Sequence, residues 1–500
     1  MSFVGLLEGI ANVMTPGNLL FAFLGCLLGT LVGVLPGLGP VSAVAILFPL
    51  TTYLPPTGMV IALAAIYYGA MYGGSTTAIL MNIPGEVSSV PTALDGFAMT
   101  RQGRAGPALA IAAIVSFVAG IFGTVVLYLV GPPLARFALL FGPAEYFGLA
   151  VFSLTAIAGL SGRSVIRGLI MAVLGMVLAA VGIDVGSSVT RLTLGSEALL
   201  QGFDIVPVMI GLFGIGEVLR ELQEGSPGIF QGRLGRLLPS GEELRQGMAA
   251  GGRATVLGFL LGLLPGMLPS ITSFLAYSYE KQRSRHPERF GRGAIEGVAA
   301  PEAANNAAAM AGFVPLLSLG IPTSPTMALI LAALIVYGLI PGPTLFTENA
   351  AFTATVIASF LVANVILLIL NLPLVGLWVR IARIPYRILA PVILGVCVAG
   401  AYSIRNTMFD VWVALAFGLV GWVLAEWSWP LAPLVLGFIL GPMAETSFRQ
   451  AISISPAIFL QRPIFLGFVV LAGVSLWLTR RWNLGAGEKG GAEAEVRAAK

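Results

Sequence analysis

Three polar residues interrupt an otherwise apolar run, APEAANNAAAMAGF, and could carry chemistry inside a membrane. Glu302 precedes Asn305 by three positions and Asn306 by four, so on a helix the three side chains share one face. A carboxylate at membrane depth is a candidate for holding a coupling ion or contacting a substrate. The alternative is a position at the membrane surface, because a basic loop lies shortly before Glu302 and could supply an arginine partner.

A second polar set lies in IYYGAMYGGSTTAILMNIPGE. The hydroxyls of Ser75, Thr76 and Thr77 could coordinate an ion or donate to a carboxylate. Close helix packing through small residues explains the same pattern equally well. Asn82 precedes Pro84 and Gly85, and we expect its amide to be buried and to need a polar partner.

Prolines and glycines break the run GVLPGLGPVSA, which starts at Gly33 inside an uncharged stretch from Leu19 to Leu50. Proline removes a backbone N–H, and glycine permits backbone conformations closed to other residues. In a membrane such a break is tolerated only where protein or a water-filled cavity satisfies it. Freed N–H groups favour anions and freed carbonyls can hold Na⁺, although a single break is usually a kink or a packing point.

The composition places these residues in a polytopic, all-α membrane protein. The 500 residues are 57% hydrophobic and 10% charged, with a mean hydropathy of +0.93, whereas soluble proteins carry roughly 25% charged residues. The formal charge of +4 reflects basic loops and does not indicate nucleic-acid binding. Cys26, Cys397 and the single histidine, His286, suit neither a disulfide framework nor a histidine metal site. No cleavable signal peptide is evident, because the first 20 residues lack Lys and Arg.

The motifs occur twice, in the same order. GVLPGLGPVSA resembles GLLPGMLPSIT, AILMNIPGEVSS resembles PLLSLGIPTSPT, and GRAGPAL weakly resembles LIPGPTL. This pattern predicts a first repeat over 1–220, a cytoplasmic linker over 221–253, a second repeat over 254–482 and a disordered tail over 483–500.

Loop charge predicts that the two repeats are inverted. No charge follows the first LPG motif, whereas five basic residues follow the second: Lys281, Arg283, Arg285, Arg289 and Arg292. The bias reverses at the second pair of motifs, because Arg101 and Arg104 follow NIPG whereas PGPTLFTEN after GIPT has no basic residue. Asp95, Arg101 and Arg104 are expected in a cytoplasmic loop, and Asp184, Arg191 and Glu197 are separately expected in an external one. Basic flanks on both sides of 254–278 predict a re-entrant hairpin with its tip at Pro265 and Gly266. Arg480 and Arg481 place the C-terminus in the cytoplasm.

Paired breaks in inverted halves indicate a substrate site near the midplane, and an elevator-like secondary transporter is the corresponding fold-level analogy. The candidate substrate residues lie at these breaks and on the polar helices: Pro36, Gly37, Leu38, Gly39, Gly74, Ser75, Thr76, Thr77, Asn82, Pro84, Gly85, Pro265, Gly266, Asn305, Asn306, Gly320, Pro322 and Thr323. Candidates for the coupling ion are Glu302, Asn305 and Thr76.

These residues also resemble a known family, the large membrane subunit (TctA-like) of the tripartite tricarboxylate transporters. The resemblance covers about residues 15–450 and lies in GVLPGLGPVSAVAILFPLT, IYYGAMYGGSTTAILMNIPGE, ALDGFAMTRQGRAGPAL, GVAAPEAANNAAAMAGFVPLLSLGIP and GLIPGPTLF. It implies import of tricarboxylates or related organic acids, driven by a Na⁺ or proton gradient, across a bacterial inner membrane. It also implies two partners, a small membrane subunit and a periplasmic substrate-binding protein. The second break departs from the expected GIPG, because Thr323 replaces a glycine and cannot easily adopt positive φ.

The expected function is therefore ion-coupled import, with two alternatives left open. One is a carrier of organic anions that works without a binding protein, and the other, less favoured, is a channel. Catalysis is not expected, because the chain lacks G-x-S-x-G, H-E-x-x-H and P-loop motifs. No cofactor is expected, and Na⁺ is the only metal that we consider.

Overall fold

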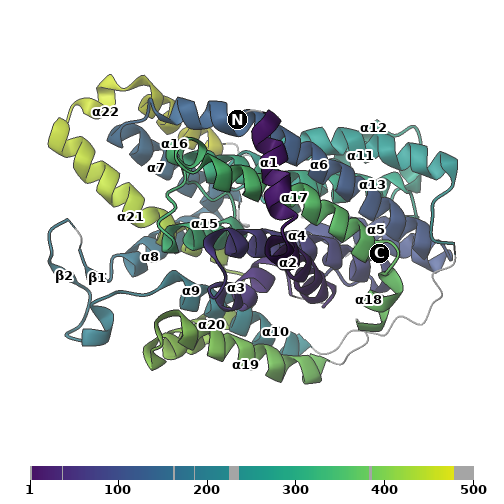
Figure 1. Ribbon diagram of the computed structural model, residues 1–500, viewed down its shortest axis with the longest axis horizontal. Helices are drawn as coiled ribbons and strands as arrows, with labels where there is room; N and C mark the ends of the chain where they lie inside the picture. The colour runs from purple at the N-terminus through teal and green to yellow at the C-terminus, as the bar shows by residue number, and fades with distance from the viewer. Residues whose placement is uncertain are drawn as a thin grey trace, which may run out of the picture. The chain divides into compact units, whose positions relative to one another are not determined.

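A computed structural model describes residues 3–35, 38–160, 164–184, 186–224, 236–381 and 386–477. The described residues are helical almost throughout (Figure 1). Among them one antiparallel pair of strands occurs, β1 (Gly182–Ile183) with β2 (Thr190–Arg191). Seven helices are long and apolar enough to cross a membrane: α2 (Pro16–Val34), α4 (Pro56–Met81), α6 (Ala105–Ala138), α17 (Ala350–Asn371), Arg387–Arg405 within α19, α20 (Met408–Glu426) and α21 (Leu431–Ile454). The expectation of an all-α, multi-pass membrane protein is confirmed.

The chain forms two compact units. The first comprises Met1–Ala138 with Val206–Trp422, and the second Leu139–Ile205 with Val423–Lys500. The remaining helices of the first unit are α1 (Phe3–Val13), α3 (Pro40–Thr51), η1 (Val87–Ser89), α5 (Val90–Arg101), α9 (Ile205–Met209), η3 (Ile210–Ile215), α10 (Gly216–Glu224), α11 (Gly241–Gly262), α12 (Pro269–Arg283), η4 (Pro287–Arg289), α13 (Glu296–Ala311), α14 (Phe313–Leu319), α15 (Pro325–Val336), α16 (Pro343–Thr347), α18 (Val375–Ile381) and α19 (Tyr386–Arg405).

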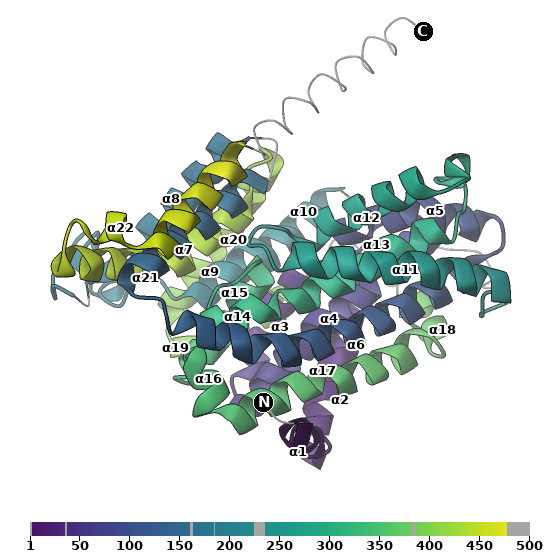
Figure 2. The ribbon, with the colours of Figure 1, turned by 90° about the horizontal axis from the view of Figure 1, so that it is seen from above.

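Two buried helices, α4 and α13, form the centre of the first unit. α13 has no exposed residue after its first turn, and α4 is buried from Gly58 to Leu80. Helix α2 packs along α4 and α11 packs along α13, while α6 contacts both α13 and α17. Figure 2 shows α11, α6 and α17 running side by side. The polar residues singled out in the sequence on α4 and α13 are therefore held deep inside this unit.

Glycines allow α2 and α4 to approach closely. Gly25, Gly29 and Gly33 recur every four residues on α2, and a Cβ on Gly29 would lie 2.7 Å from the Cα of Ile66 on α4. Conversely, a Cβ on Gly73 of α4 would lie 2.6 Å from the carbonyl oxygen of Thr30 on α2. Such four-residue repeats of small residues are the usual close-packing device of membrane helices.

The pair α11 and α13 uses the same device. A Cβ on Gly258 or Gly262 would lie 2.6 Å from the Cα of Ala304 or Ala308, respectively. The corresponding helices of the two predicted halves thus pack on their partners by one mechanism. The inversion of the halves, the re-entrant path of the hairpins and the boundaries 1–220, 221–253 and 254–482 remain predictions.

The Pro/Gly motifs break the helices where the sequence predicts. Helix α2 ends at Val34 and α3 begins at Pro40, while α11 ends at Gly262 and α12 begins at Pro269. Each later helix starts with proline in its first turn, where no backbone hydrogen bond is lost. Pro36, Gly37, Arg480, Arg481 and the tail 483–500 lie outside the described residues.

The second unit contains α7 (Pro143–Leu160), α8 (Val165–Ala179), η2 (Glu197–Leu199), α21, α22 (Ile458–Gln461) and an apolar helix over Pro463–Trp477. A four-membered ion network ties its β hairpin to α21. Arg191 pairs with Asp184 at 2.7 Å and with Glu445 at 2.8 Å, and Arg449 pairs with the same two carboxylates at 2.8 and 2.6 Å. Hydrogen bonds from Ser187 and Arg449 hold the pKa of Asp184 well below its usual range.

We expect Gly29→Ala to lower the free energy of unfolding by about 1–3 kcal/mol, because its methyl group would force α2 away from α4. Thermal unfolding of the purified protein in detergent measures this change. Gly252→Ala is the matched control: Gly252 is an exposed glycine of α11, and its Cβ would meet no atom within 4 Å. Gly252→Ala should leave stability unchanged or raise it by up to about 1 kcal/mol. Equal unfolding temperatures for Gly29→Ala and the wild type would contradict the close packing.

Candidate functional site

Glu302 lies at the contact between α13 and the first third of the chain. Its side chain is 1% exposed. The carboxylate accepts one hydrogen bond from the Ser75 hydroxyl on α4 and another from the Thr92 hydroxyl on α5, both at 2.6 Å. The arginine partner of the alternative is not found: within the described segments, the partners of this carboxylate are hydroxyls. The depth of Glu302 in the membrane remains a prediction.

The two asparagines beside Glu302 are equally buried. The Asn305 amide donates to the Glu86 carboxylate at 3.0 Å, and the Asn306 amide donates to the Ser116 hydroxyl at 2.7 Å. The side-chain oxygens of both asparagines are buried and accept no hydrogen bond from any described residue. A buried acceptor without a donor is costly, so these two oxygens mark a place where a donor or a cation would be stabilised.

A small cavity lies beside the Glu302 carboxylate. It has a volume of about 10 Å³, and its polar lining is Tyr72, Ser75, Thr76, Ser116, Glu302 and Asn371. The side-chain oxygen of Asn371 is a third buried acceptor without a donor among the described residues. A cavity of this size holds about one water molecule or one dehydrated monovalent cation. Its polar lining consists of hydroxyl, amide and carboxyl groups, and Glu302 supplies the one carboxyl among them.

The three hydroxyls after Gly74 have three different roles. Ser75 donates to Glu302, and Thr76 lines the cavity. Thr77 donates to the carbonyl of Gly74 at 3.3 Å and so satisfies its own helix. Gly73 serves packing and Ser75 donates to a carboxylate, so both features that the motif predicted are present, while coordination of an ion remains a prediction.

The first break is built around a left-handed residue. Asn82 ends α4 with φ +57°, a conformation that asparagine tolerates better than most residues. Contrary to expectation, its side chain is exposed. The chain then returns, so that the Gly85 N–H donates to the Gly74 carbonyl at 3.3 Å. A Cβ on Gly85 would lie 2.6 Å from the Cα of Gly74, which explains the glycine.

The second break repeats this plan with glycine in the left-handed position. Gly320 ends α14 with φ +71°, and Pro322 follows it as Pro84 follows Asn82. The positive φ falls on Gly320 and not on Thr323. The departure from GIPG therefore leaves the turn unstrained.

In each half, a glycine of the Pro/Gly motif lies beside the break of the same half. A Cβ on Gly39, beside the buried Leu38, would lie 3.6 Å from the Cβ of Glu86. In the second half, the N–H of Gly266, which has φ +84°, donates to the Thr323 carbonyl at 3.4 Å, next to the buried Pro265.

The predicted residues thus form two groups. One comprises Leu38, Gly39, Gly74, Ser75, Thr76, Gly85, Glu302, Asn305 and Asn306, and the other Pro265, Gly266, Gly320, Pro322 and Thr323. No hydrogen bond between described residues joins Thr323 or Gly266 to Glu302, Asn305 or Asn306.

Sequence reasoning missed several residues of the first group. Glu86 directly follows the NIPG motif, and its charge beside a helix break was an available signal. Thr92, Ser116 and Asn371 carry no comparable signal, because single polar residues of these types are common in membrane helices.

Asp95 was also misjudged, since it lies on α5 and is fully buried rather than in a loop. One carboxylate oxygen accepts from the N–H groups of Gly291, Gly293 and Ala294 at 2.8–2.9 Å, and the other accepts from the Tyr277 hydroxyl at 2.9 Å. Gly291 and Gly293 have φ of +80° and +100°, which turns successive N–H groups toward one point. Asp95 therefore fixes the entry into α13, the helix that carries Glu302.

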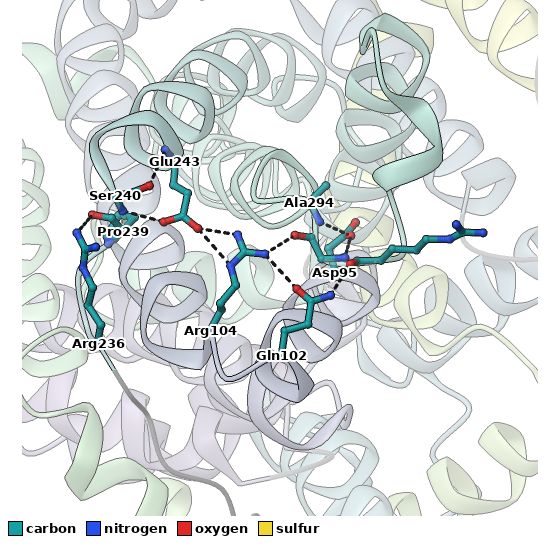
Figure 3. Close-up of polar contacts among 10 residues, drawn as sticks. Asp95, Gln102, Arg104, Arg236, Pro239, Ser240, Glu243 and Ala294 are labelled. Carbon is teal, nitrogen blue, oxygen red and sulfur yellow. Dashed lines mark hydrogen bonds and ion pairs between the residues drawn. The ribbon is translucent and has the colours of Figure 1, made fainter.

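A second contact joins the same segments (Figure 3). The Arg104 guanidinium pairs with Glu243 at 2.6 Å and donates to the Gln102 side chain and the Gly293 carbonyl, each at 3.1 Å. Glu243 in turn completes a capping box with Ser240 at the start of α11. Ion pairing and capping thus connect the ends of α5, α11 and α13.

Comparisons with known proteins identify the family of this chain. A model of the tripartite tricarboxylate transporter TctA family matches residues 19–436. An uncharacterized 52.8 kDa protein in the TAR-I ttuC′ 3′ region of Agrobacterium vitis is 47% identical over 460 residues, or 91% of this chain and 92% of that protein. An uncharacterized protein in the TAR-II ttuC′ 3′ region of the same organism is 50% identical over 210 residues, covering 41% of this chain and 87% of that protein. No solved structure matches.

We expect Asp95→Ala to destabilise the protein by at least about 3 kcal/mol, because four donors, three of them buried, lose their acceptor. Asp95→Asn retains an acceptor oxygen for the three N–H groups and should cost less, and Tyr277→Phe, which removes one bond, should cost about 1 kcal/mol. Thermal unfolding in detergent gives this ranking. Similar unfolding temperatures for Asp95→Ala and Tyr277→Phe would show that the three backbone contacts contribute little.

Proposed function

We propose a transport function from one premise: this chain belongs to the tripartite tricarboxylate transporter TctA family. The proposed function is import of tricarboxylates or related organic acids by secondary active transport. The chain is the large membrane subunit of its system. In the proposed cycle a periplasmic binding protein delivers the substrate, a small membrane subunit assists, and a Na⁺ or proton gradient drives uptake across the inner membrane, with the C-terminus in the cytoplasm. The coupling proposal rests on the buried Glu302 carboxylate of α13, which accepts hydrogen bonds from the hydroxyls of Ser75 and Thr92 in the predicted first repeat.

The membrane potential makes coupling necessary. A substrate with three negative charges entering a negative interior costs about 2.3 kcal/mol per charge per 100 mV, or roughly 7 kcal/mol in total. Cations must therefore enter with it. Glu302 is suited to this task, because it is fully removed from solvent and has no cationic partner among the described residues.

The cavity beside Glu302 fits a single Na⁺ by its donor set. Carboxylate, hydroxyl and amide oxygens line it, and the side-chain oxygen of Asn371 lacks a donor. Hard monovalent and divalent cations favour such oxygen ligands. In the cycle we propose, Thr76 and Asn305 assist Glu302 in holding the coupling ion. A proton on Glu302 is the alternative carrier, because either Ser75 or Thr92 could then accept the hydrogen bond of the carboxyl O–H while the other still donates.

The substrate carboxylates are proposed to contact the backbone at the helix breaks. Gly39, Gly85 and Gly266 bring backbone close to neighbouring segments without side-chain obstruction. Exposed Asn82 can present its amide to the substrate, and the freed N–H groups favour anions. The two repeats are proposed to lie inverted, so that their breaks approach the site from opposite sides, and one moves against the other in an elevator-like cycle.

The experiment is uptake of labelled citrate and other organic acids into proteoliposomes holding this chain, its small subunit and its binding protein. We expect accumulation only with an inward Na⁺ or proton gradient and only with the binding protein present. Uptake without the binding protein would indicate a stand-alone carrier, and current without saturable uptake would indicate a channel.

Glu302→Gln tests the coupling residue directly. We expect it to reduce gradient-driven accumulation at least tenfold while substrate exchange between loaded vesicles continues, because the amide can accept from one hydroxyl and donate to the other but carries no charge. Glu348→Gln is the matched control, since this exposed carboxylate follows α16. The same stimulation by the gradient in Glu302→Gln and the wild type would remove Glu302 from the coupling site.

Single cysteines test the inversion. Tyr53 is 76% exposed after the first hairpin, and Ser284 follows α12 after the second. The two native thiols, Cys26 and Cys397, are buried and should stay unreactive. We expect Tyr53→Cys and Ser284→Cys to react with an impermeant maleimide from opposite faces of oriented vesicles. Labelling of both from one face would rule out inverted repeats.

A further inference from the structure

A basic pocket lies in the first unit, away from Glu302. It has a volume of about 270 Å³ and lies between α11, the end of α12, the loop after it and the start of α13. Four arginines line it: Arg253, Arg283, Arg285 and Arg289. The proposed transport cycle assigns these residues no role.

Three of these guanidinium groups have no carboxylate partner among the residues that the structure describes. Arg253 is neutralised by Glu280, which it contacts through two hydrogen bonds of 2.8 and 2.6 Å. Arg283, Arg285 and Arg289 form no ion pair with any described residue. Glu296 also lines the pocket and adds one negative charge, so the pocket remains net positive and can accept an anion.

An apolar stripe continues from the pocket along α11. Val256 and Leu260 follow Arg253 by three and seven residues, so they lie on the same helix face, and they are 48% and 60% exposed. Leu264, in the turn that follows α11, is 47% exposed. Within the pocket, Phe290 supplies an apolar wall. A cationic pocket at one end of an exposed apolar stripe has the chemistry of a lipid site.

We propose that this pocket binds the phosphate of an anionic phospholipid, whose acyl chain lies along Val256, Leu260 and Leu264. Guanidinium forks match phosphate oxygens in a bidentate manner. The loop charge predicts that this basic flank is cytoplasmic, where anionic headgroups attract arginines. A soluble phosphate has the same headgroup chemistry but would not use the stripe.

The test measures binding to the purified full-length chain in detergent by the shift in unfolding temperature. The probes are phosphatidylglycerol, phosphatidylcholine and inorganic phosphate. We expect phosphatidylglycerol to stabilise the wild type, with an effect that weakens in high salt, while phosphatidylcholine and phosphate at equal concentration do not.

The pocket variant is Arg285→Gln with Arg289→Gln, and its affinity for phosphatidylglycerol should fall about thirtyfold, because each basic residue contributes about 1 kcal/mol at a membrane surface. The control, Arg101→Gln with Arg136→Gln, removes the same charge from two exposed arginines elsewhere and should bind like the wild type. If the double variant does not fold, Arg289→Gln alone serves, with about a fivefold loss.

Three results would overturn the proposal. Equal phosphatidylglycerol binding by the pocket variant and the wild type would remove the arginines from the site. Equal stabilisation by phosphatidylcholine would show that headgroup charge is not recognised. Equal stabilisation by inorganic phosphate would show that the ligand is a soluble anion and that the apolar stripe plays no part.

Discussion

A polar group taken out of water needs a partner inside the protein, and this constraint governs the centre of the first unit. Glu302, Asn305 and Asn306 lie on a helix with no exposed residue beyond its first turn. Their partners, Ser75, Thr92, Glu86 and Ser116, all come from the first 116 residues of the chain. Helix α13 can therefore be buried only when α4, α5 and α6 are packed against it. Without them its polar side chains would lack partners, at a cost of a few kcal/mol for each unpaired group.

The glycine packing and the Asp95 contacts serve the same polar centre. Close approach of α2 to α4 and of α11 to α13 fixes the two helices that carry Ser75 and Glu302. Asp95 holds the loop that leads into α13, and Arg104 connects the same loop to α11. Because these contacts are buried or charge-assisted, α5 and the start of α13 should move together, whatever motion accompanies transport.

Much of this could be predicted from residue types, and the errors have a common cause. The helix breaks lie where proline and glycine placed them, and Glu302 is inside the protein, as its apolar neighbours indicated. Asn82 was expected to be buried, but asparagine is useful there for its backbone, as a left-handed cap. Asp95 was assigned to a loop because basic residues follow it, although its own helix continues to Arg101. In each error a residue type was interpreted without knowledge of its neighbours.

The sequence by itself determined the class of molecule, the family, the positions of the breaks and the residues able to carry charge inside a membrane. These properties depend on composition and on contacts between near neighbours in the chain. Only the tertiary structure decided that Glu302 contacts Ser75 and Thr92, and that Glu86 joins Asn305. Partners 210 to 227 residues apart are chosen by helix packing, because many serines and threonines could satisfy one carboxylate and only geometry selects among them.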